Sequence, residues 1–143
     1  MYKLSASNQL AGTVVAVREG AVSGVVTIET PDGLVKADIT MNSIRELGIR
    51  EGVRATAVAN CSDLVVGAEP DGDYQLSAGN AFQGVVSRVT PGAVNAHVAV
   101  ELPSGNALLA DLELACIDEL GLAVGAPVTV RVASSDVMVW LEG

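Results

Sequence analysis

Two short polar segments contain the residue types that could bind an anion. The chain reads Leu-Ser-Ala-Ser-Asn at positions 4–8 and Leu-Ser-Ala-Gly-Asn at positions 76–80. Hydroxyl and amide side chains, together with consecutive backbone N–H groups, can form a concave nest for an anion. The same groups can instead satisfy a strand end or a turn through local hydrogen bonds. The residues alone leave both interpretations open.

A second polar interruption occurs late in each half of the chain. It reads Asn-Cys-Ser-Asp at positions 60–63 and Ala-Ser-Ser-Asp at positions 133–136, and each copy joins two apolar runs. Because it recurs at the same place in both halves, we predict that the early and late segments line one site.

The other reactive residue types form no catalytic constellation, which argues against an enzyme. The sequence has no H-x-H pair, nucleophile elbow or P-loop. His97 lies in an alternating run, where we expect a partly buried or surface strand residue. Cys61 and Cys116 match neither a disulfide framework nor a zinc motif, and we expect reduced, buried thiols. A soft-metal pocket at Cys61 would need a second ligand, which the sequence does not supply nearby.

The charge balance excludes several classes of partner. Seventeen acidic residues against eight basic ones give a formal net charge of −9. Nucleic acids and anionic membranes require clustered Lys and Arg, so we expect neither as a partner. No apolar run is long enough to span a bilayer, and the N-terminal residues lack the apolar region of a secretory signal. We therefore expect a cytoplasmic protein.

The polar segments belong to a repeat that covers the whole chain. Tyr2 aligns with Tyr74 and Gly33 with Gly105, and one extra residue then enters the second copy in a Gly-containing turn. An insertion there is what a hairpin tip tolerates. We predict a tandem duplication, with one domain at 1–68, a linker at 69–73 and a second domain at 74–143.

Each copy is expected to contain five strands and one short helix. The first has a hairpin within Gly12–Glu29, a third strand at Leu34–Thr40, one helix, and closing strands at Val53–Ala59 and Leu64–Gly67. The helix is expected to be capped by Asn42 or Ser43, to bury Ile44 and Leu47, and to end at Gly48. The second has strands at Val85–Val89, Val94–Leu102 and Ala107–Leu112, a helix at Leu114–Leu120, and closing strands at Val128–Ala133 and Val137–Leu141. This pattern predicts an all-β fold of two tandem OB-like five-stranded Greek-key barrels.

These residues resemble the molbindins, also called Mop domains. The resemblance rests on S-A-x-N, the run GTVVAVREGAVSGVV, the ELG of the short helix and the late Ser before a hydrophobic run, and it covers the chain twice. Mop domains are small cytoplasmic OB-like domains that bind molybdate or tungstate. The resemblance implies a tandem di-Mop protein that stores or buffers these oxyanions in molybdenum homeostasis, without a catalytic cofactor. It also implies a homotrimer with oxyanion sites at interfaces between domains.

Carried over onto this chain, the family's oxyanion site falls on two sets of residues. They are Ser5, Ala6, Ser7, Asn8, Thr40, Asn60, Cys61 and Ser62 in the first copy, and Ser77, Ala78, Gly79, Asn80, Ala133, Ser134 and Ser135 in the second.

Several of these positions depart from the family pattern. The family has Arg where this chain has Ser7 and Gly79, and Lys where it has Asn60 and Ala133; Glu113 takes the place of a Thr in the second copy. Hydrogen bonds to a charged donor are about twice as strong as neutral ones, so this loss of cations weakens the expected affinity.

Two functions from different classes remain. Backbone amides and hydroxyls can still hold an oxyanion without those cations, and Arg18 is the best placed residue to compensate for them. The alternative is a structural or interaction module that has kept the barrel and the oligomer interface but has lost tight oxyanion binding or takes a different ligand.

Overall fold

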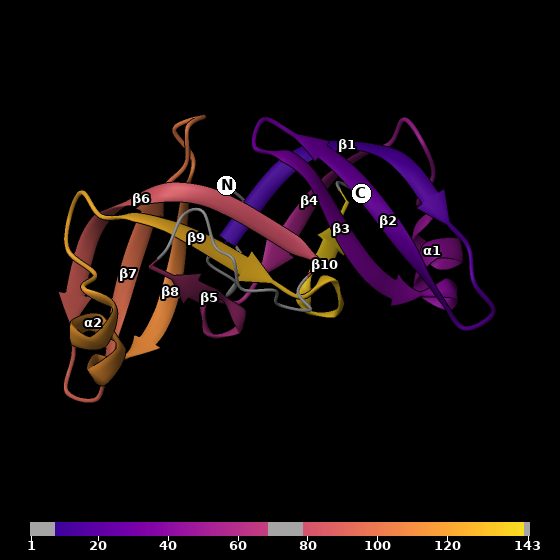
Figure 1. The fold of residues 1–143 in the computed structure, drawn as a ribbon. Coiled ribbons are helices and arrows are strands. Elements are labelled where there is room, and N and C mark those ends of the chain that lie inside the picture. The colour runs from indigo at the N-terminus through magenta and orange to yellow at the C-terminus, as the bar shows by residue number, and fades with distance from the viewer. Residues whose placement is uncertain (1–7, 69–78, 142–143) are drawn as a thin grey trace.

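The computed structural model describes residues 8–68 and 79–141, which form two five-stranded antiparallel sheets side by side (Figure 1). The first half of the chain contains β1 (Asn8–Arg18), β2 (Ser23–Thr30), β3 (Gly33–Thr40), α1 (Met41–Leu47), β4 (Arg54–Ala59), the 3-10 turn η1 (Cys61–Asp63) and β5 (Val65–Gly67). The second contains β6 (Asn80–Pro91), β7 (Asn95–Glu101), β8 (Ala107–Glu113), α2 (Leu114–Leu120), β9 (Pro127–Val132), the 3-10 turn η2 (Ser134–Asp136) and β10 (Met138–Trp140). The predicted all-β class, with one α-helix in each copy, is confirmed.

The two halves of the chain exchange their last strands. The first sheet has the order β10-β4-β1-β2-β3 and the second has the order β5-β9-β6-β7-β8. The expectation that each copy closes its own sheet is therefore wrong for β5 and β10. Because the copies share their sequence pattern, either short strand can pair with β4 or with β9, and the sequence does not distinguish the two. The boundary between the two sheets therefore differs from the predicted boundary between the two sequence copies.

The long strands β1 and β6 curve so that each can pair on both sides. The pairing of β1 with β2 shifts between Val14 and Ala16, and that of β6 with β7 shifts between Val86 and Arg88. Such bulges bend a strand and increase its twist. At Gly12 an added Cβ would come within 2.0 Å of the Glu29 carbonyl oxygen, so only glycine allows this close approach of β1 to β2.

The two short helices lie at opposite ends of the molecule (Figure 1). Helix α1 begins after Thr40, whose Oγ1 accepts a hydrogen bond from the Ser43 N–H at 3.2 Å, and ends at Gly48 with φ +66°. The predicted caps at Asn42 and Ser43 are wrong, because the last residue of β3 already has the extended geometry of an N-cap. Ile44 is buried as predicted, but Leu47 is 51% exposed.

Valine dominates the core, and the largest fully buried side chains are Ile28 and eight valines. The predicted α2 range is reproduced. One cluster of buried apolar side chains contains residues of both halves of the chain. Among the described residues, no helix is long and apolar enough to cross a membrane.

Candidate functional site

Antiparallel pairing brings the early and late polar segments of each copy together. Asn8, at the start of β1, pairs with Ala59 at the end of β4, directly before Asn60 and η1. In the second copy Asn80 pairs with Val132, directly before Ala133 and η2. The predicted neighbourhood of the two segments is therefore confirmed for the residues that the structure describes. Ser5, Ala6, Ser7, Ser77 and Ala78 lie outside the described residues.

In the second copy the two segments are in contact. An added Cβ on Gly79 would lie 3.2 Å from Cβ of Ser134 and 3.3 Å from its Oγ. This distance is tighter than most Cβ contacts, so any larger side chain at Gly79 requires a small displacement of Ser134. The backbone of the early segment thus lies against the hydroxyl of the late segment.

Asn8 and Asn80 join each half of the chain to the other. The Asn8 side chain donates to the Leu109 carbonyl oxygen at 3.0 Å and accepts from the Leu109 N–H at 2.7 Å. The Asn80 side chain donates to the Lys36 carbonyl oxygen at 2.9 Å and accepts from the Lys36 N–H at 2.8 Å. Both asparagines are buried, so these bonds satisfy polar groups that water cannot reach. The observed role of these asparagines is structural, and the oxyanion contact predicted for them remains a prediction.

The 3-10 turns also contact the other half of the chain. Turn η1 packs against β8, and η2 packs against β3. Each candidate site is therefore built from the early and late segments of one copy and the third strand of the other. We call the site with Asn8, η1 and β8 the first junction, and the site with Asn80, η2 and β3 the second junction.

The predicted residues of the late segments differ in exposure. Asn60, Ser62 and Ser135 are exposed, whereas Cys61, Ala133 and Ser134 are half-buried. The expectation of buried thiols is wrong for both cysteines, because Cys116 is half-buried as well. The Asp63 N–H donates to the Asn60 carbonyl oxygen at 3.1 Å, and the Asp136 N–H donates to the Ala133 carbonyl oxygen at 2.9 Å. These bonds hold the serine hydroxyls at the surface of each turn, where an anion can reach them.

The second junction contains a cation that the sequence did not reveal. Lys36, whose backbone holds the Asn80 side chain, is exposed between the buried residues Val35 and Ala37. Its side chain therefore projects from the outer face of β3, together with Asp38. The first junction has Leu109 at the equivalent place. Lys36 belongs to the other sequence copy, so no comparison within a copy could have assigned it to this site.

Thr40 lies away from the other predicted residues. Thr40 pairs with Ser23 at the start of β2. This part of the sheet contains the C-terminal end of β1, where Arg18 pairs with Val25. Arg18 is ten positions from Asn8, about 30 Å of strand at roughly 3.3 Å per residue. Thr40 caps α1, and its counterpart Glu113 precedes α2 without a side-chain cap bond. Neither Thr40 nor Arg18 can contribute to the first junction of its own chain.

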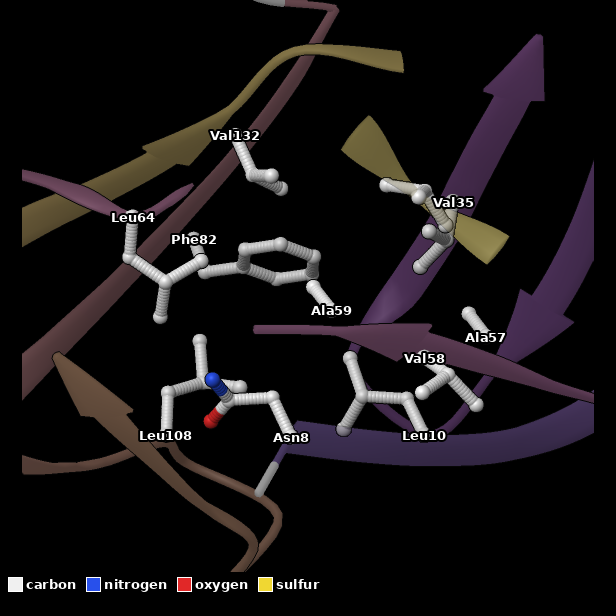
Figure 2. Close-up of a pocket in the computed structure, with 11 residues that line it drawn as sticks. Asn8, Leu10, Val35, Ala57, Val58, Ala59, Leu64, Phe82, Leu108 and Val132 are labelled. Atoms are coloured by element: carbon white, nitrogen blue, oxygen red, sulfur yellow. The ribbon is translucent and has the colours of Figure 1, made fainter. Parts of the chain in front are cut away.

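The space between the two sheets is apolar rather than an anion cage. A cavity of about 20 Å³ lies there, lined by Asn8, Leu10, Val35, Ala57, Val58, Ala59, Leu64, Phe82, Leu108, Val132 and Val137. Figure 2 shows the Phe82 ring beside Leu64 on one side and Leu10 with Val35 on the other. Asn8 is the one polar side chain in this lining, and its amide is bonded to β8. As far as the described residues define the junctions, this cavity offers no anion site, and the exposed polar groups lie at the surface.

Comparisons with known proteins agree with the duplicated fold. The TOBE domain model matches residues 4–66 and again 76–139. The molybdenum transport protein ModE of Herbaspirillum seropedicae is 38% identical over 141 residues, 98% of this chain and 52% of that protein. The molybdenum-pterin-binding protein MopA of Rhodobacter capsulatus is 33% identical over 95% of this chain and 51% of that protein. The chain spans about half the length of these curated relatives.

A solved structure resembles the chain over nearly its whole length. The cytoplasmic molybdate-binding protein ModG, solved with molybdate bound, matches with a TM-score of 0.94 and 33% sequence identity. The match covers 99% of this chain and 100% of the ModG chain. Two tandem copies in the same arrangement are therefore common to both proteins.

Proposed function

Because the chain belongs to the TOBE domain family and carries two tandem Mop-type copies, we propose that it binds and buffers molybdate or tungstate. The observation that supports this most strongly is the match to molybdate-bound ModG, which extends over 99% of this chain. The proposed role is binding rather than catalysis, in the cytoplasm, where ModG is described to act.

We place the anion at the surface of the junctions. The donors are the exposed hydroxyls of Ser62 and Ser135 and the backbone N–H groups around them, together with the serines of the two early segments. Neutral donors hold an oxyanion when several of them converge on it. Lys36 adds a positive charge at the second junction, and a charge-assisted bond is about twice as strong as a neutral one. The second junction is accordingly the tighter of the two.

We further propose that a homotrimer completes the sites. Thr40, which the resemblance assigns to the site of the first copy, lies far along the sheet from Asn8, and we assign its supply at the first junction to a neighbouring chain. An interface between identical chains brings different patches of the same surface together and can join these two ends. Thr40 and Arg18 of one chain would then face a junction of the next.

Calorimetric titration of the anion-free chain with molybdate, tungstate and sulfate tests the proposal, with native mass spectrometry to measure the assembly. We expect saturable heat with molybdate and tungstate and the mass of a trimer. Replacing the two late hydroxyls, by Ser62→Ala with Ser135→Ala, is expected to weaken the binding while leaving the assembly intact.

A structural or interaction module is the second candidate function. It is favoured by the buried asparagine bonds between the halves, by Glu113 at the position of a Thr, and by the net charge of −9. An intact trimer that gives no heat with any of the three anions would support this function and contradict oxyanion buffering.

A further inference from the structure

Three metal-ligating side chains meet at the first junction. They are Cys61 of η1, His97 of β7 and Asp111 of β8, and their ligand atoms all lie within 4.8 Å of one another. The His97 Nε2 atom is 3.9 Å from the Asp111 Oδ1 atom. The sequence placed no second ligand near Cys61, and the structure places two.

The strand exchange creates this cluster. His97 and Asp111 face each other because β7 and β8 pair in that register. Cys61 comes from the first half of the chain, and η1 reaches β8 because the strand after it, β5, pairs with β9 in the second sheet. Two parts of the chain that are distant in sequence are thus held together by the fold itself.

The ligand types and spacing match a transition-metal ion. Cysteine sulfur, histidine nitrogen and carboxylate oxygen are the usual protein ligands of zinc, at about 2.0–2.3 Å. Ligand atoms around a tetrahedral ion with such bonds lie about 3.3–3.6 Å apart, so small side-chain rotations would close the observed cluster. A mixed set of sulfur, nitrogen and oxygen ligands excludes calcium and magnesium, which prefer oxygen alone.

The burial of the three residues is also suited to an ion. Asp111 Oδ1 is buried and has no hydrogen-bond partner among the described residues. A buried acceptor without a partner is costly, and coordination would satisfy it. The His97 side chain is 53% exposed, so an ion could enter from solvent and keep a water molecule as its fourth ligand.

We propose that Cys61, His97 and Asp111 bind one divalent transition-metal ion, with zinc as the best match. The site takes a cation and is distinct in chemistry from the proposed oxyanion function.

The second junction provides an internal control. The residues that correspond to Cys61, His97 and Asp111 are Ser134, Val25 and Asp38, and Val25 pairs with Asp38 as His97 pairs with Asp111. A serine and a valine are not zinc ligands. One ion per chain is therefore expected, rather than two.

Cobalt(II) is the probe for this site, because thiolate coordination gives it an intense charge-transfer absorption band. The reduced, chelator-treated full chain is titrated with cobalt(II) in the absence of molybdate, and zinc is then added. We expect one cobalt ion per chain, a thiolate band, and its loss when zinc displaces cobalt.

Variants decide whether the named residues form the site. Cys61→Ser, which introduces the residue that the second junction has, is expected to abolish the band, whereas Cys116→Ser keeps it. His97→Val and Asp111→Asn are each expected to weaken binding at least about tenfold. Tenfold is the smaller loss that follows when a residue that only supports a metal ligand is replaced. Circular dichroism checks that each variant is folded.

A titration without a saturable thiolate band overturns the proposal, and so does a band that survives Cys61→Ser or disappears in Cys116→Ser. Molybdate calorimetry is run separately on the same proteins. A negative cobalt titration therefore does not affect the interpretation of the molybdate calorimetry, and the reverse also holds.

Discussion

At the first junction Leu109 takes the place that Lys36 has at the second, while Cys61 and His97 take the places of Ser134 and Val25. The backbone around these positions is the same, with the same asparagine bonds and the same 3-10 turn on the third strand of the other half. One duplicated framework thus carries the proposed zinc ligands Cys61 and His97 at the first junction and Lys36 at the second. Because the side chains of Asn8 and Asn80 hold this framework together, we expect that each set of residues can change without loss of the fold.

The largest effect is expected at the framework that both junctions share. Asn8→Ala and Asn80→Ala each remove two hydrogen bonds and leave the part-buried N–H and carbonyl groups of Leu109 or Lys36 without their partner. Each unsatisfied buried group costs about 1–3 kcal/mol, and these two groups are only part-buried, so we expect each substitution to lower the free energy of unfolding by about 2–4 kcal/mol, the lower part of the range for two groups. Urea denaturation measures this.

The control for the asparagines is Asn106→Ala. Asn106 also bonds across the halves, to Asp32 Oδ2 at 2.8 Å, but this contact is exposed. We expect a cost of less than about 1 kcal/mol. A similarly small cost for Asn8→Ala and Asn80→Ala would show that the two buried asparagines do not hold the junctions together.

Lys36→Ala is expected to reduce the difference in anion affinity between the junctions. Loss of a charge-assisted contact of about 1–2 kcal/mol weakens molybdate binding at the second junction by about 5- to 30-fold. The converse change, Leu109→Lys, is expected to strengthen the first junction. Arg50→Ala removes an exposed charge on the α1–β4 connection and controls for net charge. Equal losses in Lys36→Ala and Arg50→Ala would contradict a specific role for Lys36.

Gly79→Arg restores the cation that the family resemblance places in the early segment. We expect about tenfold tighter molybdate binding, worth about 1.4 kcal/mol, and a slightly lower unfolding free energy because the new Cβ crowds Ser134. Gly79→Ala introduces the same crowding without the charge. If the alanine variant gains as much affinity as the arginine variant, the arginine position is not part of the anion site.

The smallest effects on stability are expected for the residues that precede the two helices, Thr40 and Glu113. Thr40→Ala removes the cap of α1 and is expected to cost about 1 kcal/mol of unfolding free energy, whereas Thr40→Ser keeps the cap. Glu113 makes no side-chain cap bond, so Glu113→Thr is expected to stabilise α2 by about 0.5–1 kcal/mol. Thermal unfolding measures both. No change on Glu113→Thr would show that the start of α2 does not limit stability.

Local sequence patterns predicted the elements but not their partners. Alternating β-branched residues and the Gly residues after each helix located the strands and α2. The exchange of β5 and β10 was not predictable, because two similar three-residue strands fit either sheet. Leu47 was misplaced since a helix of seven residues has too little periodicity to define its buried face.

The candidate site was predictable only within each copy. The sequence predicted that the early and late segments of a copy lie close together, because this proximity depends only on strand pairing inside that copy. Lys36 and the approach of Cys61 to His97 depend on contacts between copies, which alignment of the chain with itself cannot reveal. His97 was expected on a strand surface, and its exposed side chain confirms this.

The exchanged strands also change how the assembly responds to dilution. A single copy would have to obtain its fifth strand from a second molecule, and that pairing would weaken as the protein is diluted. In this chain the donor copy is covalently attached, so each open edge meets its strand at an effective local concentration that tethering can raise to about the millimolar range. The covalent link therefore makes the pairing of β5 with β9 and of β10 with β4 independent of protein concentration.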